Sequence, residues 1–521
     1  MKNWLKNPLI KSYSFDLAAL LLGVLLTFAF APYDIFPLAA IAPAGLIALW
    51  LGASPKRAFW RGFLFGVGLF GAGVYWVFIS IHVIGEVPTL LSGFITAGMV
   101  AILALYPALV GYTVNHYFPR DTTTKLVCAY PAIWVLSEWF RSFLFTGFPW
   151  LFLGYSQTSS PLKGFAAIFS VYGVSLAIML TSALIVNSVI RYKDKDYRSF
   201  YFSLFAVMTI WIAGGLLSLI QWTRPEGKPV SVALVQGNIE QSIKWSPEHL
   251  QLSIDTYTQL TEPLWGKENI IIWPEAAIPL PLPNATSLIN DLDGKAKSSD
   301  TALIMGIPMR APQTDGYWNT IVTLGKDKNV YIKRHLVPFG EYTPFYNLFS
   351  TTFNFLNIPL SNTIPGKFEQ STLNIGKVKI LASICYEIAF PSLIRSKDKT
   401  VSMLLSVTND AWFGKSNAQA QHLQMAQMRA LEFARPVLFV GNDGITAIIG
   451  PDGMIQSAAP QREAFVLTGT VQPMYGLTPW MRNGTDPVLF IVICLLVAAV
   501  LAKRKEMRPT KSKSMLHMAS K

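Results

Sequence analysis

Long apolar runs dominate the first 221 residues of the chain and return once near its C-terminus. A helix needs about 20 predominantly apolar residues to cross the hydrocarbon of a bilayer. Eight segments approach this length, although the fifth is short and some depend on flanking aromatic residues. They are Phe15–Ala31, Ile35–Gly52, Phe59–Ile81, Leu90–Val114, Leu126–Phe140, Phe165–Ile190, Phe200–Gln221 and Val488–Ala502. The pattern therefore predicts a membrane protein with eight transmembrane helices.

Between residues 222 and 485 the pattern changes to short apolar runs separated by turn residues. Runs such as Val230–Val235, Val378–Ile384 and Met403–Val407 are uninterrupted and often β-branched, which is typical of buried strands. His249–Leu260 has helical spacing, and Ala418–Phe433 is rich in good helix formers. We therefore expect a transmembrane domain over 1–221, an extramembrane α/β domain over 222–485, and an eighth helix with a basic tail over 486–521.

Positive charge is concentrated outside the α/β segment. The chain has 43 Lys and Arg against 30 Asp and Glu, whereas residues 222–485 contain 22 basic and 21 acidic residues. The remaining basic residues gather at the N-terminus, in every second connection between the apolar runs, and in the tail. Because short basic loops stay in the cytoplasm, both termini are predicted to be cytoplasmic and the α/β domain to face the other side, which in a bacterium is the periplasm. This distribution argues against nucleic-acid binding.

Three reactive side chains follow strand-like runs of the α/β segment. Glu275 follows Ile271–Pro274, Lys333 follows Tyr331-Ile332, and Cys385 follows Val378–Ile384. Strand ends are where α/β sheets gather their active sites. Cys385 is also the only cysteine outside the apolar spans, in a domain predicted to face an oxidising compartment. Singly, each residue is compatible with packing or surface roles, but together they favour a thiol nucleophile, a general base and an oxyanion-stabilising cation.

The order Trp-Pro-Glu, then Lys before Pro-Phe-Gly-Glu-Tyr, then Cys-Tyr-Glu resembles the nitrilase, or carbon–nitrogen hydrolase, superfamily. Together with the eight spans, the chain resembles the apolipoprotein N-acyltransferase family. Phe148-Pro149-Trp150, Val235–Asn238 and Asn409–Gly414 fit the same resemblance. Val440–Gly444 departs from it, because the family pattern there is closer to Ser-Thr-Asn-Asn-Gly, and this departure bears only on local substrate contacts.

The resemblance implies an αββα sandwich for the α/β domain and a set of residue roles. It makes Glu275 the general base, Lys333 the oxyanion stabiliser and Cys385 the nucleophile. It also makes Glu341 and Glu387 supporting carboxylates and gives Trp245 a functional role. Tyr386 and Trp412 are further candidates to line an entrance for lipid chains, and Trp150 is a substrate-binding candidate that an interfacial aromatic belt would also explain. No cofactor or metal is expected, because His335 and His422 lack the spacing of zinc ligands. Both histidines are predicted to be packing residues.

The activity implied by the resemblance is a two-step acyl transfer at the inner membrane of a bacterium. Cys385 would take an acyl chain from a membrane phospholipid as a thioester. The α-amino group of the diacylglyceryl-cysteine of an apolipoprotein would then accept it, in the last step of lipoprotein maturation. The residues themselves predict only thiol-based acyl transfer.

Two other functions are compatible with the residues. One is a membrane-anchored amidase or nitrilase that acts on a small amide. The other is a transporter or channel whose extramembrane domain binds a ligand, although few ionisable residues lie in the spans and no repeated half is evident.

Overall fold

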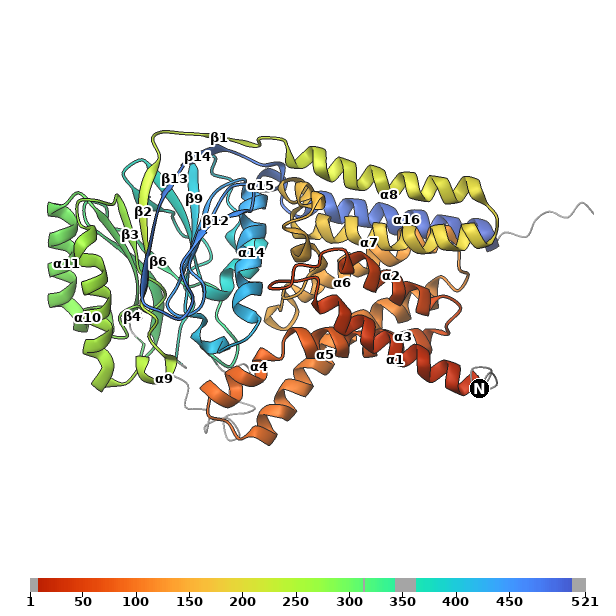
Figure 1. Cartoon of the computed structure of the whole chain (residues 1–521), viewed down its shortest axis with the longest axis horizontal. Helices are drawn as coiled ribbons and strands as arrows, with labels where there is room; N and C mark the ends of the chain where they lie inside the picture. The colour runs from red at the N-terminus through yellow and green to blue at the C-terminus, as the bar shows by residue number, and fades with distance from the viewer. Residues whose placement is uncertain (1–7, 313, 343–361, 508–521) are drawn as a thin grey trace, which may run out of the picture.

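The chain divides into a helical half and a β-sandwich half that lie side by side along the long axis of the molecule (Figure 1). This computed structural model describes residues 8–312, 314–342 and 362–507. Residues 1–7 and 508–521, which contribute to the predicted orientation, lie outside the described residues. The predicted boundaries between the three parts of the chain stay predictions.

The helical half corresponds to the predicted spans, each of which lies largely in helix. Its long helices are α1 Pro8–Thr27, α2 Leu38–Trp50, α3 Pro55–Gly73, α5 Thr89–Tyr117, α6 Tyr130–Arg141, α7 Ala166–Lys193, α8 Tyr197–Ser218 and α16 Asp486–Met507. Short helices extend this set: α4 Trp76–Ile79 runs into η2 Ser80–Ile84, and η3 Lys125–Ala129 runs into α6.

Fewer helices than predicted are long and apolar enough to cross a bilayer alone. Four meet this description, namely Thr89–Tyr117, Pro161–Lys193, Tyr197–Ser218 and Asp486–Lys505. A fifth results if Pro55–Gly73 and Trp76–Ile84, which are bent by 52°, form one span. Because Tyr13–Thr27 and Leu38–Trp50 are shorter apolar helices, the described residues support a membrane domain with four or five spans, and the count of eight is not confirmed.

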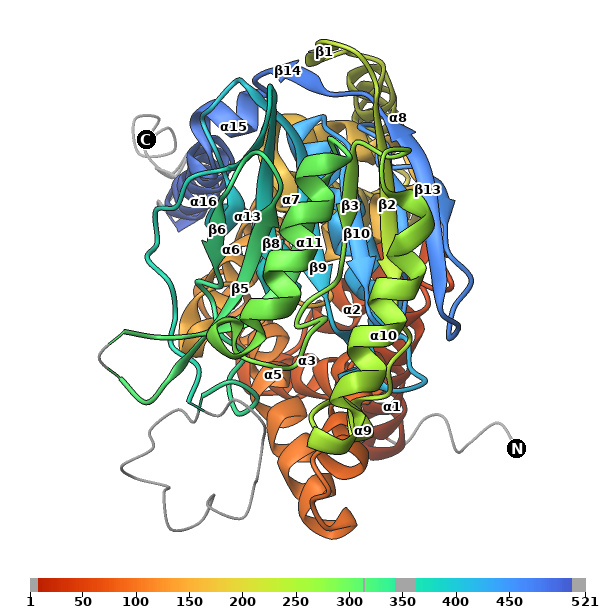
Figure 2. The same cartoon turned by 90° about the vertical axis from the view of Figure 1, so that its left-hand side faces the viewer.

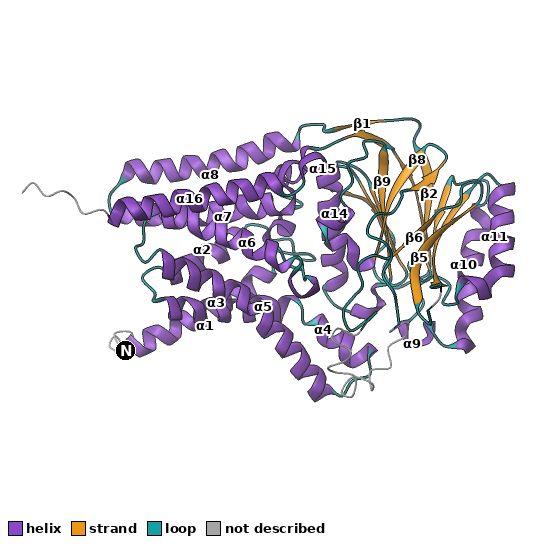
Figure 3. Ribbon diagram, turned by 180° about the vertical axis from the view of Figure 1, so that it is seen from behind, coloured by secondary structure: helices purple, strands orange, loops and turns teal. Residues whose placement is uncertain are grey.

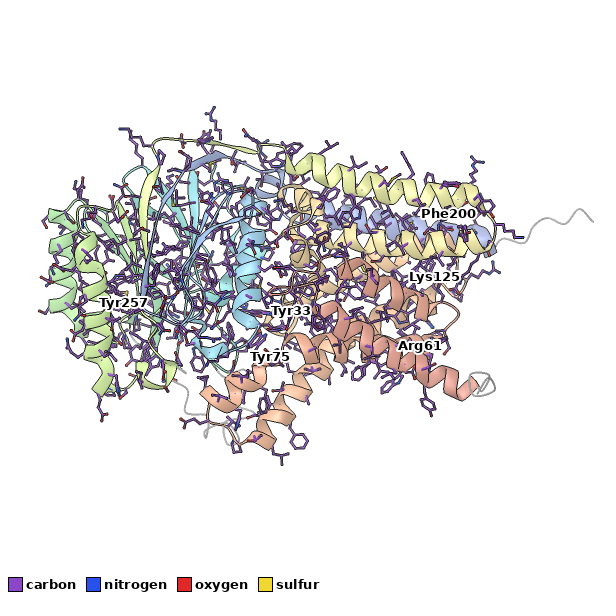
Figure 4. All side chains as sticks on the ribbon, in the orientation of Figure 1. Tyr33, Arg61, Tyr75, Lys125, Phe200 and Tyr257 are labelled. Atoms are coloured by element: carbon purple, nitrogen blue, oxygen red, sulfur yellow. The ribbon has the colours of Figure 1, made fainter. Side chains whose placement is uncertain are left out.

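Four labelled side chains mark the two ends of the helical half. Figure 4 shows Arg61 and Lys125 toward the end distant from the sandwich, and Tyr33 and Tyr75 toward the end beside it. Arg61 is buried and pairs with Asp16 at 3.4 Å. Tyrosines are enriched at membrane interfaces, and basic residues are enriched in cytoplasmic connections. The predicted orientation itself stays a prediction.

Two six-stranded sheets form the sandwich. The first contains β2 Val230–Gln236, β3 Ile270–Ile272, β4 Ala302–Arg310, β5 Tyr317–Leu324, β6 Val330–Ile332 and β13 Phe465–Val471; the second contains β7 Leu373–Ile375, β8 Val378–Ile384, β9 Val401–Thr408, β10 Val437–Gly441, β11 Ala447–Ile449 and β12 Ile455–Ala458. Their orders are β13-β2-β3-β4-β5-β6 and β12-β11-β10-β9-β8-β7. The strands β2-β3-β4 and β8-β9-β10 are parallel.

Helices cover the outer face of each sheet, so the domain has the four-layer αββα arrangement that the resemblance implies. The inner faces share one apolar core, which includes Leu234, Ile384 and Leu405. On the first sheet lie α10 Leu250–Thr261 and α11 Thr286–Ser298 (Figure 2). On the second lies α14 Ala418–Phe433, which separates the strands from the helical half (Figure 3).

Buried hydrogen bonds join α14 to the helical half. The Glu432 carboxylate accepts from Ser170 Oγ at 2.5 Å and from the Val171 backbone N–H at 2.9 Å. Trp150 Nε1 donates to Gln421 Oε1 at 2.6 Å. The second sheet is therefore attached to the helical half through α14.

Candidate active site

Glu275 and Lys333 come from the ends of two strands in the first sheet. Glu275 lies three residues beyond β3, and Lys333 follows β6 directly. Lys333 Nζ lies 3.3 Å from Glu275 Oε1. The structure thus brings together two side chains that are 58 residues apart in the sequence.

The Glu275 carboxylate is buried, with 7% of the residue exposed, and accepts hydrogen bonds at both oxygens. Oε1 accepts from Asn319 Nδ2 at 2.7 Å as well as from Lys333. Oε2 accepts from the Asn409 backbone N–H at 2.9 Å. Since all three partners donate, the carboxylate is held in one orientation and keeps lone-pair capacity for a proton.

Lys333 bridges two carboxylates. Besides Glu275, its ammonium donates to Glu341 Oε1 at 2.9 Å, and the other Glu341 oxygen accepts from the Val337 backbone N–H at 2.8 Å. Burial alone would lower the Lys333 pKa, but the charges of Glu275 and Glu341 outweigh it and hold that pKa well above its ordinary value. Lys333 is therefore a fixed positive charge.

Cys385 occupies a strained turn between β8 and the short helix η10 Cys385–Ala389. Its φ is +53°, in the left-handed region that side chains with a Cβ rarely adopt. A strained backbone conformation of this kind persists only where contacts with the surrounding structure hold it in place, and such residues are common at active sites. Burial and the charge of Glu275 raise the pKa of the thiol well above its usual value, although Lys333 opposes them. The resting group is therefore a thiol whose proton needs a base.

Glu387 ties the Lys333 strand to the Cys385 turn. One oxygen accepts from the backbone N–H groups of Arg334 and His335 at 2.7 and 3.1 Å. The other accepts from Tyr331 Oη and from the Ile384 N–H, both at 2.8 Å. Four donors around one fully buried carboxylate fix the two segments relative to each other.

Aromatic side chains from both halves meet at Tyr386, the residue after Cys385. Tyr386 Oη donates to the Gly147 carbonyl at 3.1 Å, and the Trp150 ring stacks on the Tyr386 ring at a centroid distance of 6.4 Å. Trp245 and Trp412 are half-buried, after α9 Gln241–Lys244 and within η11 Asp410–Phe413. Their role in substrate binding stays a prediction.

The sequence interpretation missed two polar residues beside Glu275. Asn319, in β5, donates to both Glu275 and Glu341. Lys244 is fully buried, and its ammonium donates to the Glu275 carbonyl at 3.1 Å. Burial lowers the Lys244 pKa to about 8, against the charge of Glu275. The only available signal was the position of Lys244 directly before Trp245, close to the Val235–Asn238 motif.

The two histidines that were predicted to pack differ in their surroundings. His335 does pack, with its ring 4.0 Å from that of Phe390, and burial lowers its pKa to about 4, helped by the charge of Lys333. His422 instead makes hydrogen bonds to Asp410 and to the Cys385 carbonyl, so ordinary packing does not describe it. Within the described ranges, no group of three His, Cys, Asp or Glu residues could hold a metal ion.

Comparison with known proteins gives matches across nearly the whole chain. Residues 22–184 match the family described as Apolipoprotein N-acyltransferase N-terminal domain, and residues 231–479 match Carbon-nitrogen hydrolase. The Apolipoprotein N-acyltransferase of Coxiella burnetii is 42% identical over 484 residues, covering 93% of this chain and 99% of that protein. That of Azotobacter vinelandii is 37% identical over 510 residues, covering 96% and 97%.

Among solved structures, the chain is similar to a CN-hydrolase superfamily protein from Xanthomonas campestris. The TM-score is 0.37 at 19% identity, over 51% of this chain and 97% of that one. An amidase from Nesterenkonia sp. gives a TM-score of 0.35 at 17% identity, over 50% and 96%.

Proposed function

Because the chain belongs to the apolipoprotein N-acyltransferase family, we propose that it transfers a phospholipid acyl chain to the N-terminal diacylglyceryl-cysteine of apolipoproteins through a thioester on Cys385. Glu275 acts as general base and Lys333 stabilises the oxyanion. The observation that carries this assignment is a buried carboxylate paired with a fixed ammonium, both near enough to the strained Cys385 for their charges to act on its thiol.

In the first half-reaction Glu275 takes the proton of the Cys385 thiol, and the sulfur attacks the ester carbonyl of the phospholipid. The carbonyl oxygen becomes an oxyanion, which Lys333 stabilises; one oxyanion donor typically contributes ~3–4 kcal/mol. The C–O bond then breaks, the leaving lysophospholipid oxygen takes the proton from Glu275, and the acyl chain stays on sulfur. The Glu275 contacts with Asn319 and the Asn409 N–H keep the carboxylate in place for both transfers.

In the second half-reaction the α-amino group of the apolipoprotein attacks the thioester. Glu275 takes a proton from this amine, the C–S bond breaks, and the Cys385 thiolate receives the proton. The product is an amide, and the enzyme returns to its starting state. A site screened from water protects the thioester from hydrolysis.

Placement of the site beside the helical half fits substrates whose acyl chains stay in the bilayer. Trp150 and the Gly147 carbonyl, both from that half, contact Tyr386, the residue next to Cys385. We propose that all eight apolar segments belong to the membrane domain, with both termini cytoplasmic and the sandwich periplasmic. The positions of Arg61 and Lys125, distant from the sandwich, support this orientation (Figure 4).

Intact-mass measurement of the purified protein tests the mechanism. With phospholipid and no acceptor, we expect wild type to gain the mass of one acyl chain, which also identifies the donor chain. Cys385→Ala should gain nothing, whereas Cys128→Ala and Cys494→Ala, which remove the other two cysteines, should keep the adduct. Adding a diacylglyceryl peptide should discharge the adduct and yield the N-acylated peptide.

Variants of Glu275 and Lys333 test whether these residues act in the reaction or only in folding. Glu275→Gln and Lys333→Ala should keep the fold and slow adduct formation by ~100-fold or more. An active wild-type enzyme with unmodified Cys385 during turnover would refute the thioester. Release of ammonia from soluble amides without transfer of lipid acyl chains would instead support an amidase.

A further inference from the structure

His422 lies with each ring nitrogen against an acceptor. On one side Nε2 is 3.1 Å from the backbone carbonyl oxygen of Cys385. On the other, Nδ1 is 3.0 and 3.3 Å from the two carboxylate oxygens of Asp410. A carbonyl cannot donate and neither can an ionised carboxylate, so both contacts are hydrogen bonds only if both ring nitrogens carry protons.

The surroundings of His422 suit a buried cation. Its exposed fraction is 1%, and Asp410 is fully buried. Trp150 stacks on the imidazole at a centroid distance of 6.0 Å, in the range at which an indole face attracts a cation. Thr408 Oγ1 donates to Asp410 Oδ1 at 2.6 Å, which favours the ionised carboxylate. Among the contacts of the described residues, Asp410 is the titratable side chain that hydrogen-bonds to the imidazole, whereas Cys385 contacts it through its backbone carbonyl.

The carbonyl that His422 contacts belongs to the peptide unit between Cys385 and Tyr386. A trans peptide is planar, and its C=O and N–H point in opposite directions. Fixing the Cys385 carbonyl therefore also fixes the direction of the Tyr386 N–H, the backbone donor of the same peptide unit. A charged donor on the carbonyl polarises the same peptide and makes its N–H a stronger donor.

We propose that His422 is a positioning residue, held as an imidazolium by Asp410, that fixes the strained Cys385–Tyr386 peptide and so aims both the thiol and the Tyr386 N–H at the reacting carbonyl. The role in the reaction rests on the proposed function of Cys385, whereas the charge state of His422 does not. The φ of +53° at Cys385 is the kind of conformation that needs such external support.

The imidazolium also has an electrostatic consequence for the thiol. Burial, the Glu275 charge and the Asp410 charge each raise the Cys385 pKa, while Lys333 lowers it. A cation paired with Asp410 cancels one of these unfavourable charges. Loss of the positive charge at residue 422 should therefore shift the pH dependence of thiol reactivity toward higher pH.

Nitrogen-15 NMR of the full-length protein in lipid bilayers tests the charge state directly. With ¹⁵N-labelled histidine, the difference between wild type and His422→Gln isolates one of the six histidines of the chain. Near pH 7 we expect both nitrogens of His422 in the protonated range, and Asp410→Asn should move one of them to the unprotonated range. An unprotonated ring nitrogen of His422 in wild type would mean a neutral imidazole, and would overturn the proposal even if Asp410→Asn fails to fold.

Rates of adduct formation and of Cys385 alkylation test the positioning role. His422→Phe, which can neither donate nor carry charge, should slow adduct formation by ~100-fold, as loss of a donor at an oxyanion site does. His422→Gln can still donate to the carbonyl, so it should keep more of the rate but show a pH profile displaced upward. His116→Gln, at an exposed position in the last turn of α5, is the matched control and should behave as wild type.

The outcomes separate this inference from the proposed function. A wild-type rate and pH profile in His422→Phe would overturn the positioning role. Absence of any acyl adduct in active wild type would refute the proposed thioester, while the nitrogen spectrum would still decide the charge state of His422.

Discussion

Replacing Lys244 by methionine should stabilise the protein and slow its reaction. Lys244 is fully buried at the end of α9, and its ammonium donates to the backbone carbonyl of Glu275 at 3.1 Å. Burial lowers its pKa to about 8, although the charge of Glu275 favours the ammonium. Near pH 7 the native state therefore contains the charged ammonium of Lys244 in a buried position, where burial destabilises the charge.

The size of the effect follows from the two pKa values. An exposed lysine in the unfolded chain titrates near ~10.4, so the native value of about 8 corresponds to ~3 kcal/mol. Below pH 8 both states are protonated and the native state bears the whole cost. Between about pH 8 and ~10.4 the unfolded state binds more protons, so stability rises with pH, and above ~10.4 the cost is gone. Methionine removes this cost but also loses a hydrogen bond worth ~1 kcal/mol, which leaves a gain of ~2 kcal/mol near pH 7.

Thermal unfolding of wild type and Lys244→Met in the same lipid or detergent checks this sign. The variant should unfold at higher temperature near pH 7, and the difference should shrink near pH 10. Lys267→Met, at an exposed position of the same domain, should show no such change. The acyl adduct should form more slowly in Lys244→Met, because the backbone carbonyl of Glu275, the proposed base, loses its hydrogen bond from Lys244. A variant less stable than wild type near pH 7, or a stability difference independent of pH, would refute the reasoning.

Four further substitutions, one of them a control, have expected effects on thermal unfolding. Glu387→Gln leaves buried N–H groups without an acceptor and should cost ~3 kcal/mol, with slower adduct formation. Gly62→Ala places a Cβ against the backbone of α5 and should cost ~1–3 kcal/mol, whereas Gly71→Ala on the same helix meets nothing within 4 Å and should be nearly neutral. Glu432→Gln leaves the charge of Arg429, 2.8 Å away, without its partner and should cost ~3–5 kcal/mol. Equal effects of the two alanines, or unchanged melting in either glutamine variant, would contradict these assignments.

Local sequence predicted the elements that carry the chemistry. Val378–Ile384 forms β8 and Ala418–Phe433 forms α14 as the patterns indicated. Cys385 is expected at the end of β8 because it directly follows a mostly apolar run. Active sites of α/β sheets gather at such strand ends. Such signals lie within a few residues and need no knowledge of the tertiary fold.

The span count could not be predicted in the same way, because hydropathy averages over composition and ignores geometry. The segment predicted as Phe59–Ile81 is broken between α3 and α4 by a bend of 52°. In an apolar 18-residue stretch of Pro161–Lys193, 78% of the residues are buried, whereas in the corresponding stretch of Tyr197–Ser218 only 11% are buried. Two helices of nearly equal mean hydropathy, 2.0 and 1.9, therefore differ in their surroundings. One is packed inside the protein and the other is exposed along its length.

Residues that support the site were missed for a related reason. Asn319 and Lys244 reach Glu275 across 44 and 31 residues of sequence, and His422 reaches Cys385 across 37. In the sequence they look like a strand amide, a helix-end lysine and a packed histidine. Only the approach of separate strands and helices gives them partners, so no local pattern could assign their roles.

The helix α14 explains why the site and the membrane domain depend on each other. A surface helix has one apolar stripe and one solvated face, but α14 is buried nearly all round, with strands on one side and the helical half on the other. Its polar residues must therefore find partners on both sides. His422 turns to the Cys385 carbonyl, while Gln421 and Glu432 turn to Trp150 and Ser170. Because one rigid helix makes all three contacts, a change where α14 packs on the helical half should also move the imidazole that contacts the carbonyl of Cys385, the proposed nucleophile. Glu432→Gln should accordingly slow acylation as well as lower the melting temperature.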